Sequence, residues 1–212
     1  GGISKLSKER LLDELRKIVS LTTLEKISKD RLILDLISVI FPELKNIKIF
    51  SKLNENQKVF LVDTDFIFLI SLMIVDGTDN VDYFLYKFNI SKKNQKRIKI
   101  IDEFFKENKN KNTFSEKNMN KIFYYNGRQA VIDILQFRII TAKKFDKKLI
   151  ELIKFYKDKT SPIMPVGANV LMAKYKIPEG KQLGLKLKII EEEWVKNDFK
   201  ISDEQIEQIV NN

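Results

Sequence analysis

Apolar residues recur at helical spacing along almost the whole chain, and this pattern restricts the possible folds more than any other feature. In two early segments the apolar side chains fall three or four positions apart, which places them on one face of an α-helix. They are Leu11, Leu12, Leu15, Ile18 and Val19 in the first segment and Leu32, Leu36, Ile37 and Ile40 in the second. No segment shows a convincing alternation of period two, the pattern of a half-buried strand. We therefore predict an all-α fold, an elongated array of many helices without a β-sheet.

The most apolar run of the sequence, residues 66–75, is predicted to form the centre of the core. Phe66, Leu69 and Ile70 are spaced for one helix face, and other apolar side chains fill the remaining faces. The run is about half as long as a bilayer-spanning helix requires, and no signal peptide is visible. We expect a buried helix in a soluble, cytoplasmic protein.

Further helices are predicted at residues 81–88, 92–108, 116–125, 128–141 and 146–157. Turn signals separate them at Asp76-Gly77 and Asn126-Gly127. Residues 107–112 contain no apolar side chain, which predicts a mobile loop. Prolines within residues 160–165 indicate a linker between a compact helical body and a final region.

The composition excludes several kinds of active site. The sequence contains no Cys and no His, so it has no disulfide, no Cys nucleophile, no His general base and no Cys/His zinc site. Asp63 and Asp65 have the only paired-carboxylate spacing that resembles a metal site. They directly precede the helix expected to begin at Phe66, where a role for Asp65 as N-cap or first-turn acid explains the pair better. We therefore predict no catalytic residue, no metal site and no bound cofactor in this chain.

Positive charge is concentrated in the middle of the chain. The formal net charge is +10. Residues 87–160 hold 20 Lys and Arg against 8 Asp and Glu, whereas residues 188–212 hold 3 against 7. Such a basic region suits a polyanionic partner such as RNA. Two alternatives stay open, namely a Lys content that follows AT-rich coding and an ordinary solvated helical surface.

The candidate RNA-binding residues are basic side chains that share a helix face or follow a turn. They are Lys92, Lys93, Lys96, Arg97, Arg128, Lys143, Lys144, Lys147 and Lys148, the last four around Phe145. Arg128 would contact phosphate or, alternatively, pair with a neighbouring helix. The aromatic side chains of Phe123, Tyr124 and Tyr125 offer a stacking platform for an unpaired base or, alternatively, ordinary core packing.

Three short segments carry a resemblance to one enzyme family. Residues 7–18, SKERLLDELRKI, match at Ser7, Glu9, Arg10, Glu14 and Leu15 the segment S-x-E-R-I-x-D/E-E-L-x-K-I-L. That segment follows the catalytic head of class II tRNA nucleotidyltransferases, the CCA-adding enzymes, and of related bacterial poly(A) polymerases. Residues 40–44, IFPEL, are similar to the element that ends a body helix in this family. Residues 125–128, YNGR, are similar to its Y-R-x-G-R turn near the end of the body.

The last region resembles the tail of the same family. The tail pattern is G-x-D-L-M-x-x-G-x-x-x-G-x-x-I/L-G, followed by a helix with L-x-x-L/I-E-x-x-W. The positions that follow it are Gly167, Leu171, Met172, Gly180, Leu183, Gly184, Ile190, Glu191 and Trp194. Together the matches span about 190 residues in the order the family uses.

The resemblance implies that residues 1–20 end the neck, 21–160 form a helical body and 161–212 form a helical tail, of which body and tail hold the tRNA acceptor arm. Glu9, Arg10 and Glu14 would then support the nucleotide pocket from behind. The family's catalytic carboxylates lie in the head, which is expected upstream and outside this chain. The opening Gly1-Gly2 likewise favours a cut fragment.

The parent enzyme implied by the resemblance uses Mg²⁺ with ATP or CTP to add CMP and AMP, or AMP alone, to RNA 3′ ends. This chain alone is expected to be inactive. Its expected partners are tRNA or another RNA 3′ end and the catalytic head domain, with no membrane. The alternative is a stand-alone helical module that binds RNA or another protein and has no link to nucleotidyl transfer.

Overall fold

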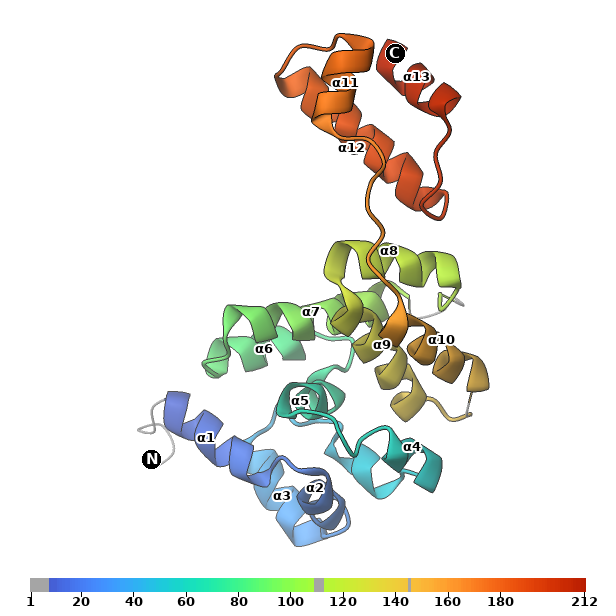
Figure 1. Cartoon of the computed structure of the whole chain (residues 1–212). Coiled ribbons are helices and arrows are strands. Elements are labelled where there is room, and N and C mark those ends of the chain that lie inside the picture. The colour runs from blue at the N-terminus through green and yellow to red at the C-terminus, as the bar shows by residue number, and fades with distance from the viewer. Residues whose placement is uncertain (1–7, 109–112, 145) are drawn as a thin grey trace. The chain divides into compact units, whose positions relative to one another are not determined.

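A computed structural model describes residues 8–108, 113–144 and 146–212. Within these ranges the chain forms thirteen α-helices and a short 3-10 helix, and it has no β-strand. The predicted all-α fold is therefore confirmed (Figure 1).

The chain packs as two compact units, and each unit is built from two separate stretches of sequence. The first unit comprises Gly1–Asn112 and Ile132–Ile153, and the second comprises Thr113–Val131 and Lys154–Asn212. Helices α9 (Arg128–Thr141) and α10 (Lys147–Asp158) each contribute residues to both units. The division into neck, body and tail segments stays a prediction.

Side-chain caps define where the early helices of the first unit begin. These elements are α1 (Lys8–Ile18), α2 (Leu21–Ile27), α3 (Arg31–Ile40), the 3-10 helix η2 (Ile47–Ser51) and α4 (Glu55–Val59). The Asp30 carboxylate accepts a hydrogen bond from the backbone N–H of Ile33, 3.1 Å away, and so satisfies an unpaired donor at the start of α3. Asn54 and Gln57 form a reciprocal capping box at α4. Ser7, which directly precedes α1, lies outside the described residues.

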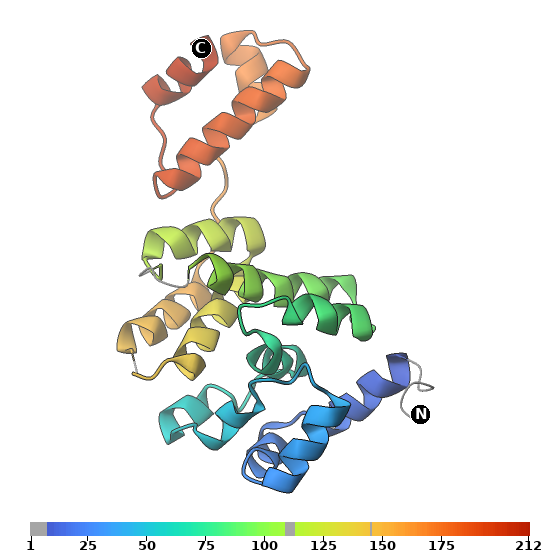
Figure 2. The same cartoon turned by 180° about the vertical axis from the view of Figure 1, so that it is seen from behind.

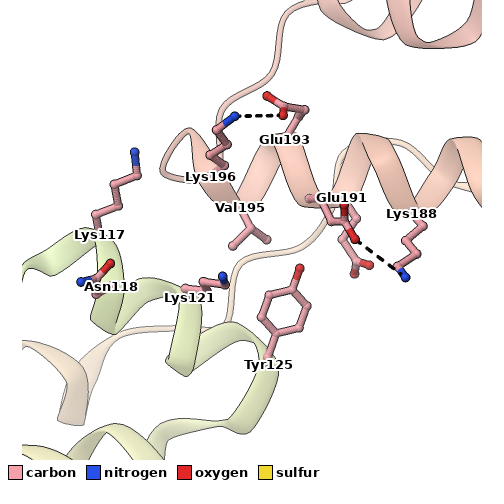
Figure 3. A pocket seen from close by; sticks show the side chains of 10 residues that line it. Lys117, Asn118, Lys121, Tyr125, Lys188, Glu191, Glu193, Val195 and Lys196 are labelled. Atoms are coloured by element: carbon pink, nitrogen blue, oxygen red, sulfur yellow. Dashed lines mark hydrogen bonds and ion pairs between the residues drawn. The ribbon is translucent and has the colours of Figure 1, made fainter. Parts of the chain in front are cut away.

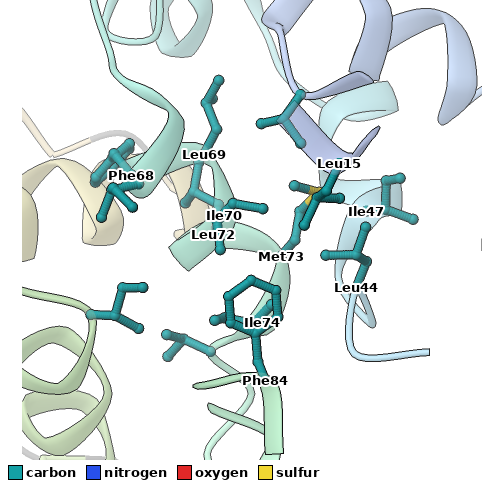
Figure 4. Close-up of a cluster of buried hydrophobic side chains, with 14 of the residues drawn as sticks. Leu15, Leu44, Ile47, Phe68, Leu69, Ile70, Leu72, Met73, Ile74 and Phe84 are labelled. Atoms are coloured by element: carbon teal, nitrogen blue, oxygen red, sulfur yellow. The ribbon is translucent and has the colours of Figure 1, made fainter. Parts of the chain in front are cut away.

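Helix α5 (Phe66–Ile74) forms the centre of the first unit, as its sequence predicts. Every residue from 67 to 74 is buried, so neighbouring elements cover all faces of the helix. Figure 4 shows its side chains among those of Leu15, Ile47 and Phe84, which come from α1, η2 and α6 (Asn80–Lys87). Asp65 is the N-cap of α5, since its carboxylate accepts from the backbone N–H of Phe68 at 2.9 Å. The predicted capping role is confirmed.

Helix α3 departs from the core stripe expected for it. The helix is present, but Leu32 is 82% exposed and Leu36 is 58% exposed. Only Ile37 is buried, and the helix packs through the narrow side that also carries Leu34 and Ile40. The expected stripe is therefore split, because the neighbouring elements within the described ranges cover one side of α3 only.

Helix α7 (Lys92–Glu107) and parts of α9 and α10 complete the first unit. Helix α7 packs on α5 and α6, and the rings of Phe105 on α7 and Phe137 on α9 lie 4.7 Å apart. The amide of Gln57 donates to the backbone carbonyls of Ile139 and Ile140, at 3.2 and 3.1 Å, and so anchors the end of α9. The expected loop at residues 107–112 falls mostly outside the described residues.

The second unit contains α8 (Glu116–Asn126), α11 (Ala168–Tyr175), α12 (Lys181–Lys196) and α13 (Asp203–Asn211), with parts of α9 and α10. Figure 1 and Figure 2 both show α11 and α13 beside α12. The contact is apolar, through Leu171, Ile190 and Ile206. Gly127 ends α8 at a φ of +86°, a conformation that favours glycine.

The five helices predicted between residues 81 and 157 all occur, each within one residue of its expected bounds. Among the described residues, no helix combines the length and the apolar character needed to cross a bilayer.

Candidate nucleic-acid interface

The first candidate cluster lies at the start of α7. Ser91 caps this helix by accepting from the backbone N–H of Asn94. Lys92, Lys93 and Lys96 follow on its exposed surface. Within the described ranges none of these three lysines pairs with a carboxylate. Lysines in the first turn also oppose the positive end of the helix dipole, so the helix gains no stability from Lys92 and Lys93.

Arg97, the next residue of that cluster, is part of the core packing. Its Nε and a terminal nitrogen donate to the two carboxylate oxygens of Asp133, at 2.6 and 2.9 Å, and its other terminal nitrogen donates to Asp65. Burial acts to lower the pKa of the guanidinium, but the two carboxylates outweigh it and raise that pKa. The same arginine, together with the N–H of Phe68, lowers the pKa of Asp65 although burial acts to raise it. Arg97 therefore joins α7, α9 and the start of α5, and we no longer assign it to phosphate binding.

The second cluster lies between α9 and α10. Its exposed lysines are Lys143, Lys144, Lys147 and Lys148; Phe145, between them, lies outside the described residues. Asp146 accepts from the backbone N–H of Lys148 at 2.9 Å and thereby serves the first turn of α10. In the described part of the chain, none of the four lysine ammonium groups pairs with a carboxylate.

Both clusters belong to the first compact unit. Helix α9 contacts the helix that carries the first cluster and directly precedes the second. Asp133, which holds Arg97 beside the first cluster, precedes Thr141 by eight residues, or about 12 Å along a helix. The second cluster begins just after Thr141. Together the two clusters hold seven lysines without carboxylate partners among the described residues.

Arg128, the remaining basic candidate, belongs to the second unit. Its guanidinium donates to the backbone carbonyls of Tyr156 at 3.1 Å and Lys159 at 2.9 Å. These carbonyls lie at the end of α10, where an arginine satisfies acceptors that the helix leaves unpaired. This contact is the pairing with a neighbouring helix that the sequence left open as an alternative.

Two of the three candidate stacking aromatics are packed inside the second unit. Phe123 is 2% exposed and its ring lies 5.4 Å from that of Tyr156. The Tyr124 hydroxyl donates to the Glu191 carboxylate at 2.5 Å, and this bond, with burial, raises the pKa of Tyr124 to about 12. Tyr125 is 45% exposed and is the one aromatic of this trio with a ring accessible to a ligand.

Tyr125 lines a groove between α8 and α12, with a volume of about 680 Å³ (Figure 3). Lysines and glutamates share its lining, and two of the lysines are already paired. Lys196 lies 3.3 Å from Glu193, and Lys188 lies 3.9 Å from Glu192. The groove is therefore much less suited to phosphate than the two lysine clusters.

The residues expected to support a nucleotide pocket lie on α1. Glu9, Arg10 and Glu14 are on its exposed side, opposite the buried Leu11, Leu12 and Leu15. Glu14 pairs with Lys17 at 2.7 Å. The described residues contain no group of three acidic side chains placed to hold a metal ion.

The sequence-based search missed Lys45, Lys48 and Lys52. They line a groove of the first unit beside Thr141. Lys48 lies on η2, and Lys45 and Lys52 lie on either side of it. Their spacing of three and four positions was a usable signal, since basic side chains so spaced share a face where the chain is helical.

Comparison with known proteins adds no family assignment. No protein-family model matches this sequence. No curated protein matches it at a significant level.

Proposed function

We propose that this chain is the RNA-binding part of a tRNA nucleotidyltransferase or poly(A) polymerase, an enzyme that adds CMP or AMP to RNA 3′ ends. In this proposal the chain holds the acceptor arm of tRNA or a similar RNA end. A catalytic head domain, with Mg²⁺ and ATP or CTP, carries out the transfer. We expect the protein to act in the cytoplasm.

One observation carries the proposal: seven exposed lysines of the first unit have no carboxylate partner among the described residues. They are Lys92, Lys93, Lys96, Lys143, Lys144, Lys147 and Lys148. Four of them occupy the first turns of α7 and α10, where the helix dipole disfavours positive charge. A phosphate backbone would compensate charges that the fold itself leaves uncompensated.

The chemistry of RNA recognition fits such a surface. Proteins recognise RNA helices largely through backbone and shape, because the bases of the deep major groove are out of reach. Lysines without a base-reading motif are therefore sufficient to hold an acceptor stem. The order of the family-like segments along the chain is the separate support for tRNA as the RNA.

The first test is tRNA binding by the purified chain at low and moderate salt, against a hairpin that lacks an acceptor arm. We expect a preference for tRNA that weakens as salt rises. The double substitution Lys147→Ala/Lys148→Ala should reduce the slope of log binding constant against log salt concentration by about 1.5, since each phosphate contact contributes about 0.7 to 0.9.

The matched control is Lys26→Ala/Lys29→Ala, which removes two exposed lysines elsewhere in the same unit. Equal loss in both variants, or affinity that does not change with salt, would argue against the proposal. Incorporation of labelled ATP or CTP by this chain alone would contradict the assignment of transfer to a separate head.

The second candidate function is a protein-interaction module. The observation that favours it is the exposed apolar stripe of α3, where Val39 is 74% exposed beside Leu32 and Leu36. Contiguous apolar surface of this kind is typical of protein interfaces. This candidate predicts no RNA binding and a concentration-dependent association, seen in sedimentation, that Leu32→Gln/Leu36→Gln abolishes.

A further inference from the structure

A second groove lies in the first compact unit, and none of the seven lysines that carry the proposed function lines it. Its volume is about 480 Å³, within the usual range of small-molecule sites. Residues around η2 form one side of it, and Val75 and Thr141, at the ends of α5 and α9, lie on the others.

Lysines supply the polar part of this groove. Lys45 pairs with Asp76 at 3.1 Å. Burial acts to raise the pKa of Asp76, but hydrogen bonds from Thr78 and the contact with Lys45 outweigh it and lower that pKa, so Asp76 is charged and neutralises Lys45. Lys48 and Lys52 are exposed and have no carboxylate partner in the described part of the chain. The groove therefore keeps two uncompensated positive charges.

Apolar side chains supply the rest of its lining. Ile49, Leu72 and Val75 contribute aliphatic surface. The half-buried ring of Phe105 contributes aromatic surface. Phe137 is only 5% exposed, and its ring supports that of Phe105 at 4.7 Å. A flat group can lie on such a surface, while a small hydrated anion would gain nothing from it.

The groove is connected to one of the lysine clusters through Thr141. The hydroxyl of Thr141 donates to the carbonyl of Phe137 at 2.8 Å, which holds its side chain against α9. Lys143 follows two residues later, so its Cα lies within about 7 Å of that of Thr141. A strand of RNA that crosses the cluster can thus continue into the groove.

We propose that this groove binds one unpaired nucleotide of RNA, with Lys48 and Lys52 on the phosphates and the base on the apolar surface of Ile49 and Phe105. The inference rests on the proposed RNA-binding function and adds a site to it. An unpaired nucleotide fits because its base is free to leave the stack, whereas the bases of a duplex are not. Two cations beside an apolar surface match the two parts of a nucleotide.

The test compares two RNAs by fluorescence anisotropy, a single-stranded octanucleotide and a blunt hairpin copied from an acceptor stem. Lys48→Ala/Lys52→Ala should weaken binding of the octanucleotide about tenfold and reduce its salt slope by about 1.4, from about 0.7 per phosphate contact. Binding of the blunt hairpin should change by less than about twofold. Lys48→Arg/Lys52→Arg should retain affinity, and Lys26→Ala/Lys29→Ala is the charge-matched control.

Photocrosslinking provides a readout that charge alone would not produce. An octanucleotide with 4-thiouridine should crosslink to the peptides that contain Phe105 or Phe137, and less so in Lys48→Ala/Lys52→Ala. Crosslinks elsewhere, or equal losses on both RNAs, overturn the inference. Binding of the hairpin without binding of the octanucleotide overturns it and leaves the proposed function standing, whereas binding of neither RNA at low salt overturns both.

Discussion

Neighbouring residues on α7, Lys96 and Arg97, should respond in opposite ways to substitution. Arg97→Met removes the guanidinium that neutralises Asp133, whose side chain is 1% exposed, while the arginine side chain is 17% exposed. Asp133 then keeps a buried charge without its ion-pair partner. Lys96→Met removes an exposed ammonium instead.

The expected size of the effect follows from this burial. Removing one partner of a buried ion pair destabilises a protein by about 3 to 5 kcal/mol. Asp65 adds little, since its side chain is 56% exposed and exposed pairs contribute about 0.2 to 1 kcal/mol. Lys96→Met should change the free energy of unfolding by less than about 0.5 kcal/mol.

Urea unfolding followed by far-ultraviolet circular dichroism measures these changes, because the signal comes from the helices. With an m-value of about 2 kcal/mol per M, Arg97→Met should lower the midpoint by about 2 M. Arg97→Met/Asp133→Leu should recover most of the loss, since apolar side chains replace buried ion pairs at little cost.

The reasoning is refuted if Arg97→Met costs less than about 1 kcal/mol, or if the double variant is no more stable than the single one. RNA binding gives the opposite ranking. Lys96→Met should weaken it, and Arg97→Met should leave it unchanged wherever the variant is folded.

Three further predictions concern stability. The pKa of Asp65 is lowered from 3.8 in the fold, so its stabilising effect is complete above about pH 4 and is lost as pH falls through the lower folded value. Urea midpoints should accordingly fall less between about pH 5 and 2.5 in Asp65→Asn than in the parent; parallel curves would contradict this. Tyr124→Phe should cost about 1 to 2 kcal/mol by losing its bond to Glu191, while Tyr125→Phe serves as control; equal effects would remove the role of the bond. Gly127→Ala should cost about 1 to 3 kcal/mol in thermal unfolding because of its positive φ, whereas no change in melting temperature would show that the turn relaxes freely.

The helices could be predicted from the sequence because their signals are local. The apolar run at residues 66–75 predicted a helix that is buried on all faces, and α5 is at the centre of the first unit. Asp65 was expected to cap the apolar helix, and it accepts the backbone hydrogen bond of an N-cap. Ser91 caps α7 in the same way. Propensity and capping act within one or two turns, so a sequence carries them directly.

The roles of individual charged residues could not be predicted in the same way. Lys96 and Arg97 are adjacent and both basic. Their roles differ because Asp133 of α9 pairs with Arg97 and not with Lys96. Arg128 likewise became a cap for α10 through tertiary packing. Contacts between distant segments decide which cations stay exposed.

The exposed stripe of α3 and the interleaved units have the same origin. Helical spacing places Leu32 and Leu36 on the same face as Ile37. The spacing does not tell which side of that face a neighbouring helix covers. The sequence pattern also does not tell at which residue α9 passes from one unit to the other. The family resemblance remains a prediction for the experiments above.

The fluorescence of Trp194 reports on the second unit alone. It is the sole tryptophan of the sequence, it is 2% exposed, and its ring lies 4.9 Å from that of Phe199 and 5.3 Å from that of Tyr124. All three rings belong to the second unit. Tryptophan fluorescence excited near 295 nm therefore reports on the packing of α8 against α12, without a signal from the first unit. A red shift of the emission would show that water has reached the contact between these two helices.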